Sequence, residues 1–260
     1  MRRFKTVSGA PQSVGTALER TQAVAVFETG LRLLQNEALQ KKSDIEGATR
    51  IVEALGLPSH HDFQKNWDTL KCLAHVLLTT PADQPILDAG SGARGVILRW
   101  LHAFGYRNLY ACDRIEVDQS LFLEPLKIQF KKQDLANTTY TDGQFAAISC
   151  ISVIEHGVDL DSFFKEMSRI LRPQGRLLIS TDYWSEPVDC SGIYPYGREH
   201  GEMKIFTAKE AVEFVEVAAR YQLMPTFAIN LETNEKAVRW NRVDRKYTFL
   251  FVALEKTATH

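Results

Sequence analysis

The fold is decided by one short stretch, Pro85-Ile86-Leu87-Asp88-Ala89-Gly90-Ser91-Gly92-Ala93-Arg94-Gly95. It begins as an apolar run typical of a buried strand, passes through glycines and continues into the helical pattern of residues 95–103. Glycines let the backbone turn sharply and approach a ligand, and the first turn of a helix offers unpaired amide groups. The stretch therefore predicts a ligand-binding turn between a strand and a helix.

Two kinds of ligand fit this turn. Gly90, Gly92 and Gly95 match the G-x-G-x-x-G pattern of dinucleotide sites, with Asp113 about where a ribose contact is required. Asp88 argues for the other ligand, because a carboxylate beside the turn repels a pyrophosphate and attracts a ligand that carries an ammonium and a sulfonium. This favours S-adenosylmethionine over a nicotinamide cofactor, although Asp88 could instead cap the following helix.

Outward from the turn, short apolar runs alternate with helical patterns. The expected strands are 85–89, 108–112, 127–131, 145–150, 176–181, 224–231 and 247–254, and the expected helices between them are 95–103, 116–122, 160–171 and 208–221. Such alternation predicts right-handed crossovers and a doubly wound α/β fold, with helices on both faces of a mostly parallel seven-stranded sheet. Residues 230–244 lack a helical pattern, so we expect the last strand to be antiparallel.

The N-terminal third differs from the rest of the chain. Apolar residues recur at helical spacing in 17–41, 45–55 and 63–78, which predicts an N-terminal helical layer. We divide the chain into a helical extension, residues 1–80, and a ligand-binding domain, residues 81–260.

Composition limits the classes of partner and the compartment. The 260 residues carry 31 Lys+Arg against 32 Asp+Glu, a net charge of -1, and this balance disfavours nucleic acid as a partner. The four cysteines form no C-x-x-C pair, as is typical of reduced thiols. No apolar run is long enough to span a membrane, so we expect a cytoplasmic protein with no membrane partner.

Residues 86–95 resemble the first motif of the class I S-adenosylmethionine-dependent methyltransferases, and the order of later motifs extends the resemblance from about Trp67 to Leu254. The resemblance implies methyl transfer to a small acceptor, with S-adenosylhomocysteine as the product. One departure is that the third glycine of the commonest motif falls at Arg94, one residue before Gly95. Arg94 could therefore pair with the cofactor carboxylate or lie on the helix surface.

The resemblance also implies a set of cofactor contacts. Asp113, at the end of the second strand, matches the acid that binds both ribose hydroxyls, and Asp134-Leu135 matches an acidic and apolar pair at the adenine. Residues 145–156 resemble the fourth strand and the segment after it, which border both cofactor and acceptor. The expected cofactor-binding residues are Asp88, Gly90, Ser91, Gly92, Asp113, Arg114, Asp134, Leu135 and Ser152.

His156 is the candidate catalytic base, because it follows the strand toward whose end the methyl group should point. A base is needed only if the acceptor must lose a proton, and a structural role for His156 stays open. Glu155 and His156 also match part of a metal-binding pattern found in some methyltransferases. Its first position is Ser152 here, and although His200 could complete a site, we predict no metal.

The unpatterned segment 182–206 is expected to be a lid or binding loop beside the acceptor. Its aromatic residues alternate with charged ones and could bind a polar acceptor, such as one containing a sugar, or could pack against the helical layer. Trp67 likewise could cover the cofactor or belong to the core. Two other functions stay open, a nicotinamide-dependent oxidoreductase and a protein that binds S-adenosylmethionine without catalysis.

Overall fold

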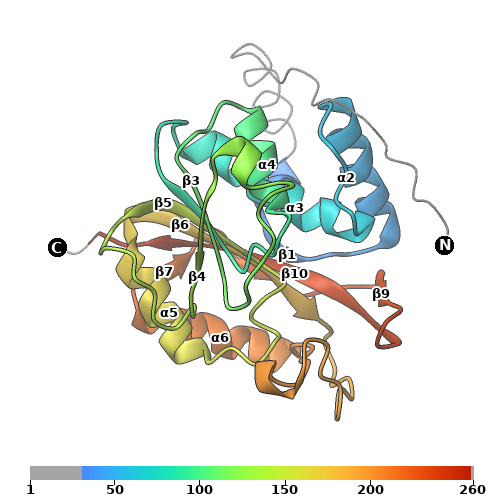
Figure 1. Ribbon diagram of the computed structural model, residues 1–260. Helices are drawn as coiled ribbons and strands as arrows, with labels where there is room; N and C mark the ends of the chain where they lie inside the picture. Colours follow the sequence, from blue (N-terminus) through green and yellow to red (C-terminus); the bar gives the residue numbers. More distant parts are fainter. Residues whose placement is uncertain (1–30, 259–260) are drawn as a thin grey trace, which may run out of the picture.

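Helices cover both faces of one central sheet in the computed structural model, which describes residues 31–258 (Figure 1). Helices α2 (Lys42–Ala54), α3 (Asn66–Thr79) and α4 (Val96–Ala103) lie on one face. Helices α5 (Leu160–Ile170) and α6 (Ala208–Arg220) lie on the other. The doubly wound α/β fold that the sequence predicts is confirmed.

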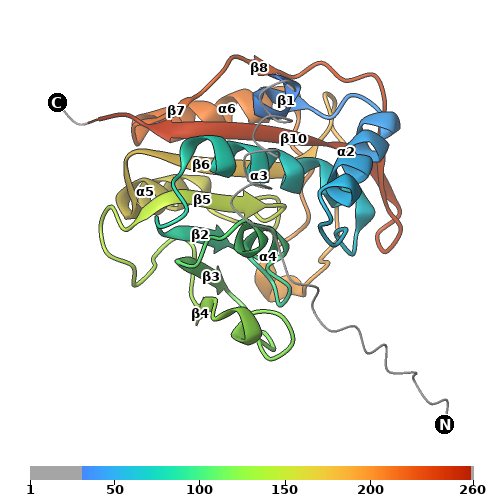
Figure 2. The same cartoon turned by 90° about the horizontal axis from the view of Figure 1, so that it is seen from above.

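The strands follow one another across the sheet in the order β4-β3-β2-β5-β6-β10-β1-β8 (Figure 2). Their bounds are β1 Asn36–Ala38, β2 Ile86–Ala89, β3 Leu109–Asp113, β4 Gln129–Lys132, β5 Phe145–Ile151, β6 Leu171–Tyr183, β7 Leu223–Pro225, β8 Ile229–Asn230, β9 Val238–Trp240 and β10 Arg245–Lys256. Strands β2 to β6 pair in parallel, and β10 is antiparallel to β6, β1, β7 and β9. The antiparallel last strand is confirmed, but the sheet has ten strands instead of seven, because β1, β8 and β9 were not expected as separate strands.

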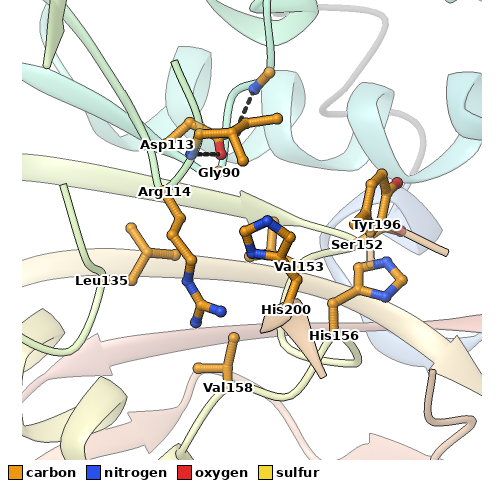
Figure 3. Close-up of a pocket in the computed structure, with 12 residues that line it drawn as sticks. Gly90, Asp113, Arg114, Leu135, Ser152, Val153, His156, Val158, Tyr196 and His200 are labelled. Atoms are coloured by element: carbon orange, nitrogen blue, oxygen red, sulfur yellow. Dashed lines mark hydrogen bonds between the residues drawn. The ribbon is translucent and has the colours of Figure 1, made fainter. Parts of the chain in front are cut away.

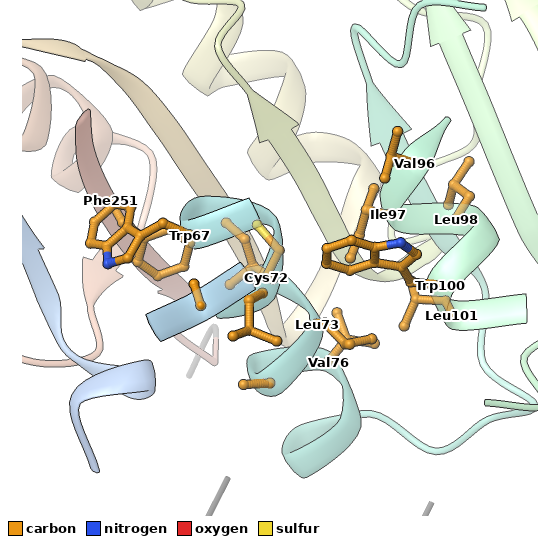
Figure 4. Close-up of a cluster of buried hydrophobic side chains, with 14 of the residues drawn as sticks. Trp67, Cys72, Leu73, Val76, Val96, Ile97, Leu98, Trp100, Leu101 and Phe251 are labelled. Atoms are coloured by element: carbon orange, nitrogen blue, oxygen red, sulfur yellow. The ribbon is translucent and has the colours of Figure 1, made fainter. Parts of the chain in front are cut away.

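The long strand β10 shows why the sheet is buried on both faces. Phe249 and Phe251 point into the apolar cluster under α2, α3 and α4, which also contains Trp67 and Trp100 (Figure 4). The alternate residues of β10, among them Val252, belong to the cluster under α5 and α6. Successive side chains of a strand point to opposite faces, so a nearly continuous apolar run fits a strand covered by helices on both sides.

The predicted helix 17–41 is wrong where the structure tests it. Residues Leu31–Leu34 form a short 3-10 turn, and Asn36–Ala38 form β1. The buried carboxamide of Asn36 accepts a hydrogen bond from the Ala253 amide (2.7 Å) and donates to the Phe227 carbonyl (2.9 Å). These distant partners outweigh the local helical spacing. Residues 17–30 lie outside the described part of the chain.

The other two N-terminal helices are confirmed as α2 and α3, and short 3-10 turns at Phe63–Lys65, Glu124–Leu126 and Arg198–His200 complete the helical elements. No regular helix forms at 116–122. The division of the chain at residue 80 stays a prediction; β1, from before that boundary, pairs with β10, from after it.

All four cysteines are buried free thiols. Within residues 31–258, no helix has the length and apolar content that crossing a membrane requires. A cytoplasmic location stays a prediction.

Candidate cofactor and acceptor site

A pocket lies at the carboxyl ends of the parallel strands, where the strand order reverses between β2 and β5. Open α/β sheets bind ligands at this position, because loops from neighbouring strands diverge there. Its lining residues come from segments after four strands and from the 182–206 loop: Gly90, Gly92, Asp113, Arg114, Ile115, Leu135, Ser152, Val153, His156, Val158, Tyr196 and His200 (Figure 3). The pocket therefore brings together seven of the ten residues that the sequence nominated.

The glycines of the turn have different physical tasks. A side chain at Gly90, whose φ is +81°, would place its Cβ 2.3 Å from Val153 Cγ2, so this residue lets two backbone segments approach. A Cβ at Gly92, where φ is +56°, would meet nothing within 4 Å, so the space above it is open toward the pocket. Gly95, at φ +45°, precedes the first residue of α4. The turn therefore leaves room for a ligand next to its own backbone.

Asp113 is held in place by the same turn. Its Oδ2 accepts a hydrogen bond from the Gly92 amide at 2.9 Å, and its Oδ1 accepts one from the Ile115 amide at 3.1 Å. Each carboxylate oxygen keeps a further lone pair for a ligand hydroxyl. The neighbouring Arg114 reaches across the pocket toward Val158, beside Leu135, and forms no hydrogen bond or ion pair within residues 31–258 (Figure 3).

Three nominated residues do not line the pocket. Asp88 is buried behind the turn, where its carboxylate accepts a hydrogen bond from Ser149 Oγ at 2.8 Å, and burial raises its pKa to about 7. Ser91 bonds to the Gly92 carbonyl at 3.1 Å. Asp134 is exposed and accepts a hydrogen bond from the Ala136 amide at 3.0 Å. Asp88 can act on a ligand through its charge, but in this structure none of the three forms part of the wall.

The opposite end of the pocket, which we call the histidine end, consists of Ser152, His156, Tyr196 and His200 (Figure 3). Ser152 follows β5 with a φ of +53°, a strained value for a non-glycine residue that is often found at functional sites. The His156 ring contacts the Tyr196 ring edge to face, with centroids 4.9 Å apart. Burial lowers the pKa of His156, so its imidazole is neutral at pH 7, and its Nδ1 has no hydrogen-bond partner among the described residues.

A close backbone crossing positions the histidine end. His156 and Met203 form an antiparallel bridge, and the Lys204 amide donates to the Glu155 carbonyl at 2.9 Å. A Cβ at Gly157 would lie 2.9 Å from the Gly201 Cα, so a side chain there would force the two segments apart. The 182–206 loop is therefore pinned to the segment after β5, next to the pocket.

The sequence did not reveal a partly buried charged group, Lys65, that lies behind the histidine end. The Lys65 ammonium is hydrogen-bonded to Ser152 Oγ, lies 3.8 Å from Asp68 Oδ2 and lies 3.8 Å from the centre of the Phe249 ring. Burial opposes its charge most strongly, but the carboxylates of Asp68, Asp182 and others outweigh this and raise the pKa of Lys65. The sequence did contain one indication of this pair. Lys65 and Asp68 are three residues apart at the start of α3, a helix whose residues are otherwise buried on every side.

The structure also decides between the alternative roles of Trp67, Arg94 and the aromatic residues of the 182–206 segment. Trp67 is buried in the core and is not part of the pocket wall. Arg94 is exposed, with its guanidinium 5.9 Å from the centre of the Phe122 ring. Of the five Phe, Trp and Tyr residues in the 182–206 segment, Tyr196 alone lines the pocket, and the Tyr183 hydroxyl donates to the Leu231 carbonyl at 2.8 Å. A stacking platform of several rings is therefore absent from the pocket within residues 31–258.

A metal-binding arrangement was the other possibility raised by Glu155, His156 and His200. Among the residues that the structure describes, no three His, Cys, Asp or Glu side chains are grouped so that they could hold a metal ion.

Comparison with known proteins adds a family match. A family model described as a methyltransferase domain matches residues 60–218, more than half of the chain. No match was found among curated proteins.

Solved structures share the fold. A geranyl diphosphate methyltransferase in complex with GPP and sinefungin has a TM-score of 0.56 at 19% identity, over 76% of this chain and 80% of that one. Geranyl diphosphate C-methyltransferase from Streptomyces coelicolor A3(2) has a TM-score of 0.54 at 18% identity, over 79% and 88%. A putative sarcosine dimethylglycine methyltransferase from Galdieria sulphuraria has a TM-score of 0.55 at 15% identity, over 81% and 98%.

Proposed function

The chain belongs to the class I S-adenosylmethionine-dependent methyltransferases, and on that premise we propose that it methylates a small polar acceptor bound at the histidine end of the pocket. The observation that carries the proposal is the pairing of the Asp113 carboxylate with the glycine turn at one end of the pocket and of polar side chains with His156 at the other. A cofactor at the first end would leave the second end for the acceptor.

The residues present fit the cofactor. We propose that Asp113 binds the two ribose hydroxyls, that Leu135 packs on the adenine beside Arg114, and that the open face above Gly92 receives the amino-acid end. Asp88 would contribute its negative charge from behind the turn, because a cationic ligand stabilises its ionised form. The bound cofactor supplies a methyl group on a sulfonium, which is already a good leaving group.

The protein's own task is then to orient the acceptor and, where the acceptor is protonated, to take its proton. Holding two reactants in line contributes roughly 7–11 kcal/mol to lowering a barrier. His156 is the proposed base, because its imidazole is neutral and its ring lies on the pocket wall. Ser152, Tyr196 and His200 supply polar groups that can orient the acceptor. A sugar-containing acceptor is not carried forward, because the expected set of aromatic rings does not line the pocket.

Calorimetric titration with S-adenosylmethionine, S-adenosylhomocysteine and NADH, each added separately to the purified protein, tests the cofactor assignment. We expect binding of the first two and none of NADH. Binding of NADH alone would mean that the site performs hydride chemistry, as a nicotinamide-dependent oxidoreductase would. Transfer of a labelled methyl group to small polar compounds then tests catalysis against a role in binding alone.

A further inference from the structure

Three buried carboxyl groups and one ammonium group lie behind the histidine end of the pocket. Three carboxylates, those of Asp68, Glu155 and Asp182, are at most 2% exposed. The Lys65 ammonium is the cation beside them, and it approaches Asp68. Burial penalises the ionised forms and so raises the pKa of both Asp68 and Asp182, and for Asp182 the nearby Glu155 carboxylate adds to the effect. A cation brought by a ligand would relieve this penalty.

Glu155 is the member of this group that lacks a partner. Its Oε2 accepts a hydrogen bond from Thr181 Oγ1 at 3.1 Å, but its Oε1 is buried with no hydrogen-bond partner within residues 31–258. Such an atom is costly to leave unpaired, and in native structures each one requires an explanation. Glu155 precedes His156, which lines the pocket, and its charge helps to raise the pKa of Tyr196, after the larger effect of burial. Glu155 is fully buried and does not itself line the pocket, so its carboxylate lies behind the wall that His156 helps to form.

Aromatic rings surround the same end. The His156 ring lies 6.1 Å from Trp240, and Tyr196 lies 6.5 Å from Trp240, in addition to the 4.9 Å contact between His156 and Tyr196. Ring faces attract cations, more strongly where water is excluded. Arg242 also acts on Tyr196, but this side chain is exposed to solvent, which screens its charge.

We propose that the methyl acceptor is a protonated amine, whose ammonium group binds at the histidine end of the pocket against the rings of His156 and Tyr196, with the Glu155 carboxylate behind them supplying the negative charge. This inference rests on the proposed function and specifies its substrate class. Lys65 already shows that these carboxylates accommodate an ammonium group. A neutral hydroxyl acceptor would leave the burial penalty on the ionised carboxyl groups unrelieved.

The methyl transfer to an amine balances with the groups that line the pocket. The bound ammonium loses one proton to the neutral imidazole of His156, which lines the pocket, and this frees the nitrogen lone pair. The nitrogen forms a bond to the methyl carbon as the bond from that carbon to sulfur breaks, and the bonding electron pair stays on sulfur. The products are a methylated ammonium and S-adenosylhomocysteine, and the released proton passes from the protein to solvent.

The test uses the full-length protein saturated with S-adenosylhomocysteine and two probes of nearly equal size, n-butylamine, which is protonated at pH 7.5, and butan-1-ol. Binding is followed by NMR of the tryptophan indole groups, with Trp240 assigned by substitution. We expect the ammonium to bind at least tenfold more tightly than the alcohol and to shift the Trp240 resonance. Glu155→Gln should abolish the preference, whereas Glu186→Gln, on an exposed part of the 182–206 loop, should preserve it.

The outcomes separate this inference from the proposed function. If S-adenosylhomocysteine does not bind, the proposed function fails. If it binds but the two probes bind equally, or the ammonium does not bind, the amine assignment is overturned and the methyltransferase assignment stands. If Glu155→Gln does not fold, proton release from the wild-type protein provides the test. The bound cation should favour ionised carboxylates, so the protein should release protons as the ammonium binds. Calorimetry then gives a binding heat that depends on the ionisation enthalpy of the buffer. A heat that is independent of the buffer contradicts the inference.

Discussion

Replacement of Asp113 tests the core of the cofactor site. We expect Asp113 to accept hydrogen bonds from two ribose hydroxyls, and a bond to a charged group contributes roughly 1.5–3 kcal/mol. Asp113→Ala should therefore cost about 3–6 kcal/mol of binding free energy, a loss in affinity of roughly 10²–10⁴-fold. Asp113→Asn keeps one acceptor oxygen but loses the charge, so its loss should be smaller, about tenfold to a hundredfold.

The substitution also affects the turn itself, and the assay must separate the two effects. Asp113 bonds to the Gly92 and Ile115 amides, so its removal should lower the free energy of unfolding by about 1–3 kcal/mol. Thermal melts measure this loss, and calorimetry with S-adenosylhomocysteine, at a temperature where each variant is folded, measures affinity. Asp118→Asn is the matched control, because Asp118 accepts from the Ser120 amide (3.0 Å) in an exposed turn outside the pocket. Undiminished affinity in folded Asp113→Ala would refute the assignment.

Three further substitutions probe the turn and the sheet. Gly90→Ala should destabilise the fold by roughly 1–3 kcal/mol, since its Cβ would lie 2.3 Å from Val153 at a φ of +81°. Adding Val153→Ala should restore part of this loss in thermal melts. An unchanged melting temperature for Gly90→Ala would contradict the packing. Asp88 stays protonated in the native state up to about pH 7, whereas the unfolded carboxyl ionises near pH 4, so wild-type stability should fall as pH rises between these values. Asp88→Asn should then be more stable than wild type by up to about 4 kcal/mol at pH 8, a difference that shrinks toward pH 4 in urea unfolding; an equal difference at both pH values would show the pKa to be unshifted. Asn36→Ala should cost about 2–4 kcal/mol, because it leaves the Ala253 amide unpaired in the core, and hydrogen exchange at that amide should quicken; unchanged protection would show that Asn36 does not hold β1.

The sequence predicts those parts of the fold that depend on local pattern. The apolar run 85–89, the glycine turn and the helix after it are dictated by neighbours within a few residues, and the structure has them as β2 and α4. By contrast, β1 has three residues and depends on hydrogen bonds to residues more than 200 positions away, such as Ala253. No periodicity within 17–41 contains that information, and the helical spacing there was misleading.

The candidate site divides in the same way. Gly92, Asp113, Leu135 and His156 follow strands in an order that the resemblance supplies, and the structure brings them to one pocket. The contribution of Lys65 is not visible in the sequence, because its partner Ser152, just after β5, lies 87 positions later in the chain. Asp88 differs from both. Its place beside the glycine turn was predicted correctly, but its side chain points away from the pocket, toward Ser149.

The place of β10 between β6 and β1 determines the order in which the molecule can be assembled. β1 (Asn36–Ala38) pairs with β10 (Arg245–Lys256), although more than 200 residues separate the two strands in the sequence. Closing contacts over so long a separation is entropically costly and slows folding. Until β10 arrives, one edge of β6 stays open, and an open edge of this kind invites pairing with other chains. Completion of the sheet therefore depends on the arrival of β10, and the edge of β6 stays exposed for as long as that strand is unpaired.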